Sequence, residues 1–135
     1  MARLTENQVI NFLRVWLENK GWKIDKISKG INRGNDIEAS KGRKVMIVEA
    51  KGSKANPKAH NKVRDKFDSG QIKDNFGKAL VKVLEQRHLN PAVTVAIAQP
   101  NDPYIRQCLQ NVTPEARKIN IRLFWVESRT RIDEE

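Results

Sequence analysis

The sequence predicts an α/β domain in which a mixed central sheet is flanked by helices. Two segments, 6–20 and 71–90, place apolar residues at helical spacing, whereas residues 92–98 form an uninterrupted apolar run typical of a strand buried on both faces. The expected order is helix, three strands, long loop, helix, strand, helix, strand, which favours helices on both faces of the sheet. The 135 residues suffice for one core, so residues 1–135 are expected to form a single domain.

The first half of the chain carries clear helix and turn signals. A helix is expected to begin after Thr5, a residue type that favours the N-cap position, and to end at Gly21. Lys41-Gly42 is expected to form a tight turn that joins two strands into a hairpin. Strands are expected over residues 22–27, 36–40 and 43–50.

The second half begins with a segment of different composition. Residues 52–70 are rich in Lys, Asn, Ser and Pro, and we expect a long, mobile, basic loop there. A helix is expected from Gln71 until Pro91 breaks it, followed by the apolar strand. Another helix is expected to open at Pro103 and to turn Val112 toward the core. A strand over 121–126 and a polar tail over 130–135 are expected to complete the chain.

The net charge of the chain indicates which class of molecule the protein binds. Lys and Arg number 26 against 16 Asp and Glu, a net charge of +10, which favours nucleic acid over an anionic membrane as partner. Residues 1–9 show no signal segment, and the apolar run at 92–98 is too short to span a bilayer, so no membrane partner is expected. The single cysteine, Cys108, excludes an intrachain disulfide and fits a reducing, cytoplasmic setting.

Charged residues gather where two of the expected strands meet. Asp36 opens one strand, and Glu49 and Lys51 end the next, in KVMIVEAKG. Residues two apart in a strand point to the same face, and a direct hairpin would bring Asp36 close to residues 47–49. Asp36 and Glu49 could then share Mg²⁺ or Mn²⁺, joined by the carbonyl of Ala50, because these ions prefer hard oxygen ligands.

Phosphodiester cleavage is the chemistry that such a set favours. A divalent ion polarises the phosphoryl group and lowers the pKa of a bound water. Lys51 beside it can orient or help to deprotonate that water, and can stabilise the developing negative charge.

Gly34-Asn35-Asp36, followed by Val48-Glu49-Ala50-Lys51, resembles the PD-(D/E)xK nuclease superfamily. Its members include type II restriction enzymes, Mrr-like nucleases and archaeal Holliday-junction resolvases. The resemblance covers most of the chain and implies a three-layer restriction-endonuclease-like core and a metal-dependent DNA endonuclease. Asn35 stands where the family usually has proline.

The resemblance also implies roles for individual residues. Asp36 and Glu49 would bind the metal, and Lys51 would be the catalytic lysine. Many members place a glutamate on the first helix near the site, and Glu6 matches better than Glu18, which falls on the wet face. Some Mrr-like members carry a glutamine on the helix after the lysine strand, where this chain has Gln71.

Nucleic acid would be held mainly by the basic loop. Lysine and arginine side chains there could neutralise phosphates beside the site and make binding strongly dependent on salt. A homodimer is possible, since cutting two strands needs two sites. The expected contacts are Arg33, Lys54, Lys58, Lys62, Arg64 and Lys66.

Each of these interpretations has a simpler alternative. Glu49 and Lys51 could form a surface salt bridge, Glu6 could be a first-turn carboxylate favoured by the helix dipole, and Gln71 could be an ordinary helix N-terminal residue. At the level of the whole protein, the alternatives are a non-catalytic nucleic-acid-binding module on a degenerate nuclease fold and a basic protein–protein adaptor.

Overall fold

A mixed sheet forms the centre of the computed structural model, which describes residues 3–28, 34–54 and 67–135. The sheet of the described residues has six strands in the order β1-β2-β3-β4-β5-β6. β3, β4 and β5 run parallel to one another, and the remaining neighbours pair antiparallel. The elements are α1 (Glu6–Asn19), β1 (Lys23–Ile27), β2 (Ile37–Lys41), β3 (Lys44–Ala50), α2 (Ser69–Leu89), β4 (Thr94–Pro100), α3 (Pro103–Cys108), α4 (Thr113–Lys118), β5 (Arg122–Val126) and β6 (Ile132–Glu134).

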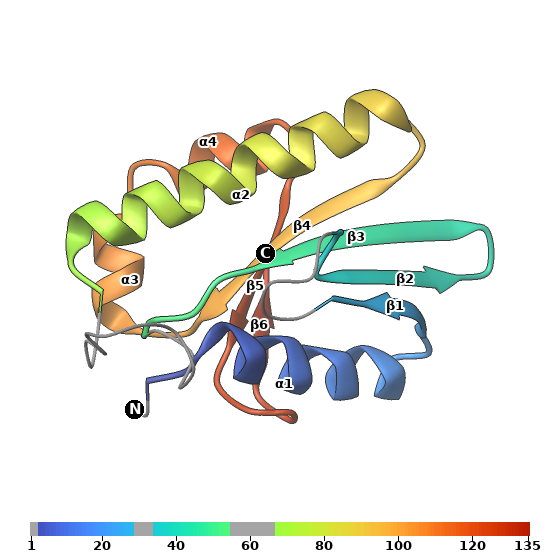
Figure 1. The fold of residues 1–135 in the computed structure, drawn as a ribbon, viewed down its shortest axis with the longest axis horizontal. Coiled ribbons are helices and arrows are strands. Elements are labelled where there is room, and N and C mark those ends of the chain that lie inside the picture. Colours follow the sequence, from blue (N-terminus) through green and yellow to red (C-terminus); the bar gives the residue numbers. More distant parts are fainter. Residues whose placement is uncertain (1–2, 29–33, 55–66) are drawn as a thin grey trace.

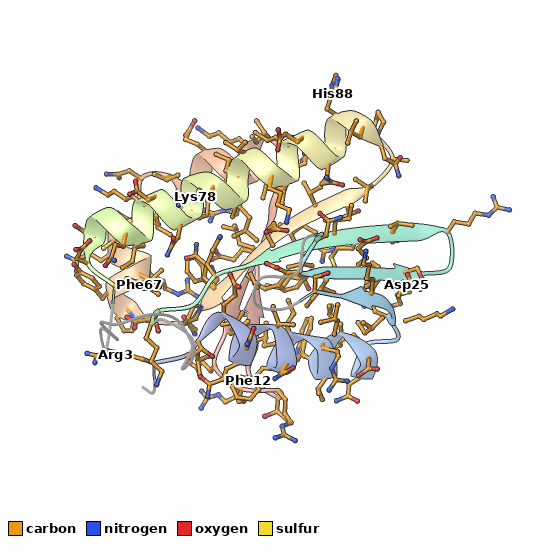
Figure 2. All side chains as sticks on the ribbon, viewed as in Figure 1. Arg3, Phe12, Asp25, Phe67, Lys78 and His88 are labelled. Carbon is orange, nitrogen blue, oxygen red and sulfur yellow. The ribbon has the colours of Figure 1, made fainter. Side chains whose placement is uncertain are left out.

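Helices cover the sheet on both faces, as the sequence predicts (Figure 1). α1 lies on one face and α2, α3 and α4 lie on the other. Alternate residues of each strand serve the two cores, so Met46 and Val48 of β3 meet α1, whereas Ile47 packs under α2. Side chains fill both spaces between helix and sheet (Figure 2), and each space holds a hydrophobic core. The α/β fold class and its three-layer arrangement are therefore confirmed.

The two long helices begin at capping boxes. Thr5 caps α1 by accepting a hydrogen bond from the Gln8 amide at 3.2 Å, and the Gln8 side chain accepts from the Thr5 amide at 2.9 Å. Asp68 and Gln71 repeat this arrangement at the start of α2. Such reciprocal hydrogen bonds satisfy amides that the helix itself leaves unpaired. The cap at Asp68 explains why α2 begins at Ser69, two residues before the predicted start.

The C-terminal half differs from the sequence prediction in its last segment and between β4 and β5, where two short helices, α3 and α4, replace the single predicted helix. The segment predicted as a polar tail contains β6, which pairs with β5 and sets Asp133 opposite Trp125. Its polar composition is that of an edge strand, which the alternation of apolar residues does not reveal. Val112, predicted to face the core, is 36% exposed, because the helix predicted to contain it ends at Cys108.

Residues 52–54, just after β3, contact the segment at which α1 begins. Ser53 donates its amide to the Leu4 carbonyl at 2.7 Å, and its hydroxyl accepts from the Leu4 amide at 3.0 Å. Lys54 forms an isolated parallel bridge with Thr5. Gly52 lies so close to this segment that an added Cβ would meet the Glu6 amide nitrogen at 2.5 Å. This contact fixes where Glu6 enters the fold.

None of the helices in the described ranges is both long enough and apolar enough to cross a membrane.

We expect Gly52→Ala to destabilise the protein by roughly 1–3 kcal/mol, since the methyl group would collide with the main chain of residues 4–6. Chemical denaturation measures the change. Gly77→Ala is the matched control: a Cβ at Gly77 would meet nothing within 4 Å, and this position lies inside α2. That control should gain about 0.5–1 kcal/mol from helix propensity. Equal effects of the two substitutions would show that the contact at Gly52 is not tight.

Candidate active site

Two carboxylates meet at the ends of the paired strands β2 and β3. The register pairs Ile37 with Val48, so Asp36, one residue before β2, lies opposite Glu49. The Asp36 carboxylate accepts a hydrogen bond from the Ala50 amide at 2.8 Å, and the Asp36 amide donates to Glu49 Oε1 at 3.4 Å. The predicted hairpin therefore brings Asp36 and Glu49 together.

Glu6 lies within the electrostatic reach of this pair. Burial and then the charge of Asp36 raise the pKa of Glu6 to about 7; Glu49 adds to this effect, whereas Lys51 and Lys82 oppose it. Glu6 belongs to the first turn of α1, which the contact with Gly52 and Ser53 holds against the end of β3. We call Glu6, Asp36 and Glu49 the acidic cluster.

Burial also raises the pKa of both other members of the cluster. For Asp36, the hydrogen bond from the Ala50 amide and the charges of Lys82 and Lys51 oppose the rise in pKa. For Glu49, the charge of Asp36 raises the pKa further, while the contact with Lys82 lowers it. Partial burial of like charges at one place is typical of functional sites, because ordinary packing avoids it.

Lys82 of α2 is a member of the site that sequence reasoning missed. Its ammonium lies 3.1 Å from Glu49 Oε1 and donates to the Gly34 carbonyl at 2.5 Å. In the sequence, Lys82 is one of several lysines beside the apolar stripe of a helix. Only the packing of α2 over the end of β3 distinguishes it from Lys78, which is exposed.

Further polar residues are buried around the cluster. The Asn35 side chain, 8% exposed, donates to Glu38 at 3.3 Å and to Gln86 at 3.4 Å. Gln99, 4% exposed, follows the apolar run of β4, and its Oε1 has no hydrogen-bond partner among the described residues. Gln99 and Lys51 line the same cavity of about 10 Å³. The sequence signal that could have pointed to this position is a glutamine directly after the apolar run 92–98, where a strand buried on both faces is expected.

Other predicted site residues occupy different places or lie outside the described residues. Gln71 completes the capping box with Asp68, accepting from the Asp68 amide at 3.0 Å, so a structural role is evident and a catalytic one stays a prediction. Lys54 lies beside the start of α1. Arg33, Lys58, Lys62, Arg64 and Lys66, and with them most of the predicted basic loop, lie outside the described residues.

The donor set can be compared with the predicted metal. Within the described ranges, no group of three or more His, Cys, Asp or Glu side chains is placed to hold a metal ion. Mg²⁺ is commonly bound by one or two carboxylates together with waters and substrate phosphates. Asp36 and Glu49, whose carboxylates each accept a main-chain amide from the other strand end, supply the two carboxylates that such a site uses. Ligation by Glu6 or by the Ala50 carbonyl stays a prediction.

Two solved structures share this fold. An XisH family protein from Nostoc punctiforme PCC 73102 superposes with a TM-score of 0.56 at 17% identity, covering 93% of this chain and 95% of that one. An FdxN element excision controlling factor protein from Anabaena variabilis superposes with a TM-score of 0.59 at 18% identity, covering 94% and 96%. No family model and no curated protein matches the sequence. At these identities the comparison establishes the fold alone.

The pH dependence of stability reports on the acidic cluster. Folded Glu6 keeps its proton up to about pH 7, whereas the unfolded chain releases it near the ordinary value of 4.5. The folded state therefore binds more protons between these values, and stability falls as the pH rises through this interval. The raised pKa values of Asp36 and Glu49 act in the same direction.

We expect Glu6→Gln to lose less stability than the wild type between about pH 5 and about pH 8, because the amide cannot ionise. Chemical denaturation in EDTA at the two pH values measures the difference. Glu18→Gln on the same helix is the control, since Glu18 is exposed and pairs with Arg14. An identical pH dependence in wild type and Glu6→Gln would place Glu6 outside the cluster.

Proposed function

We propose that this protein is a metal-dependent endonuclease that hydrolyses phosphodiester bonds of DNA. The observation that carries the proposal is the direct contact between the Asp36 and Glu49 segments at the ends of two paired strands. The charge of Lys51 acts on Asp36 and on Glu6, and the charges of Asp36 and Glu49 act on Glu6. A set of carboxylates flanked by lysines, partly removed from water, is the arrangement that hydrolysis of a phosphodiester needs.

Each residue has a role in the proposed reaction. Asp36 and Glu49 would hold Mg²⁺ or Mn²⁺, which when bound polarises the phosphoryl group and lowers the pKa of a water. Lys51 would orient the attacking water and stabilise charge that develops on the phosphate oxygens. Glu6, with a pKa of about 7, is suited to accept a proton near neutral pH.

DNA is the proposed substrate because of the charge of the chain. A net charge of +10 favours a polyanion, and Lys51 and Lys54 lie within four residues of the end of the strand that carries the site. A homodimer, with one site for each strand of a duplex, belongs to the same proposal.

A second candidate is a nucleic-acid-binding module without catalysis. Lys82 already neutralises Glu49 at 3.1 Å, and this pairing is what a site that has no use for a metal would retain. One protein of the same fold is named as an FdxN element excision controlling factor, and a controlling role is compatible with a module that does not itself cut. This candidate binds nucleic acid with a strong dependence on salt and cuts none.

A cleavage assay tests the nuclease proposal. Purified protein is incubated with supercoiled plasmid, linear duplex, single strand and a four-way junction, in Mg²⁺, Mn²⁺ or EDTA. We expect cutting that requires the metal and falls by at least about a hundredfold in Glu49→Gln and Lys51→Ala. Lys44→Ala, which removes an exposed lysine from the other end of β3, should cut at close to the wild-type rate.

Two results would contradict the proposal. Cutting that survives in Glu49→Gln or in EDTA would assign the activity to something other than this site. Salt-dependent binding to DNA with no cutting in either metal would favour the non-catalytic module.

A further inference from the structure

Lys82 connects α2 to both strands that carry the carboxylates. From α2 it reaches Glu49 near the end of β3 and the Gly34 carbonyl just before β2. α2 runs above β3 in Figure 1, and the two elements are in contact. The Lys82 ammonium thus lies at the junction where Asp36 and Glu49 meet, and its charge acts on every member of the acidic cluster.

Glu49 needs such a partner. Its side chain is only 5% exposed, and a buried carboxylate without a compensating charge or hydrogen bond is strongly disfavoured. Glu49 Oε1 receives the Lys82 ammonium at 3.1 Å and the Asp36 amide at 3.4 Å. Among the residues that the structure describes, Lys82 is therefore the cation that contacts this oxygen.

The same oxygen belongs to the proposed metal pair, and an ammonium and a divalent ion repel each other strongly when they contact one carboxylate oxygen. Lys82 can give way, because its side chain is 36% exposed and lysine carries its charge on a flexible four-carbon stem. We propose that a divalent cation displaces the Lys82 ammonium from the Glu49 carboxylate, and that this exchange sets the affinity of the site for the metal. This inference rests on the proposed function.

The two possible roles of Lys82, competitor of the metal or structural salt bridge, predict opposite effects of its loss on metal affinity. If Lys82 only held α2 to the sheet, its loss would loosen the site and weaken metal binding. If Lys82 competes with the ion, its loss removes the competitor and leaves Glu49 in need of a cation. Metal affinity then rises even though the protein without metal becomes less stable.

The test measures binding of Mn²⁺ alone, by the electron paramagnetic resonance signal of the free ion, at mildly alkaline pH where carboxylates are ionised. We expect Lys82→Gln to bind Mn²⁺ about tenfold more tightly than the wild type, because one charge-assisted hydrogen bond no longer has to be broken. Lys82→Arg keeps the positive charge and should not bind more tightly. Lys78→Gln removes the same charge one turn earlier on α2, where the lysine is exposed, and should stay within about twofold of wild type.

Thermal denaturation provides an independent measurement. In EDTA, Lys82→Gln should melt below the wild type, and Mn²⁺ should raise its melting temperature more than it raises that of the wild type. If Lys82→Gln is unfolded in EDTA, recovery of its folded circular dichroism spectrum on addition of Mn²⁺ reports the same exchange.

The outcomes separate this inference from the proposed function. Suppose that the wild type cuts DNA and binds Mn²⁺, and that the affinity of Lys82→Gln for Mn²⁺ is equal to or lower than that of the wild type. This result overturns the exchange and leaves the nuclease proposal standing. Absence of Mn²⁺ binding in wild type and Lys82→Gln alike overturns both. A wild type that neither binds Mn²⁺ nor cuts, beside a Lys82→Gln variant that binds it, supports the exchange and contradicts the nuclease activity.

Discussion

Three carboxylates placed partly out of water at one corner of a sheet are the constraint on which this structure depends. Glu6, Asp36 and Glu49 each have a raised pKa, and burial is the largest cause for all three. The surrounding structure compensates with an amide from Ala50 and the ammonium of Lys82. A fold selected for stability alone would place apolar residues here. The loss of stability caused by burying these carboxylates is understandable if the cluster binds a ligand or takes part in a reaction.

Much of the fold could be predicted because its signals are local. Apolar periodicity identified α1 and α2, and the Lys41-Gly42 turn gave the register that puts Asp36 opposite Glu49. β6 could not be predicted in this way, since an edge strand buries little and its residues are mostly polar. Val112 was wrongly expected in the core, because the helix that contained it in the prediction stops one turn earlier.

The residues of the candidate site also differ in whether local sequence signals predict their positions. Asp36, Glu49 and Lys51 follow from two strands joined by a tight turn, so the sequence places them correctly relative to one another. Lys82 depends on how α2 lies across the sheet, which helical periodicity alone does not fix. Gln71 matched a family pattern by position, whereas the capping box with Asp68 explains the residue through local hydrogen bonding.

The hydrogen bonds between Leu4 and Ser53 have a consequence for the order in which the protein folds. Asp36 and the Ala50 amide are 14 residues apart and can meet as soon as the hairpin closes. The hydrogen bond between Leu4 and Ser53 spans 49 residues, and the one between Gly34 and Lys82 spans 48. Closing longer loops costs more chain entropy and slows folding. We therefore expect the two strand carboxylates to come together early in folding, and Glu6 and Lys82 to join them later.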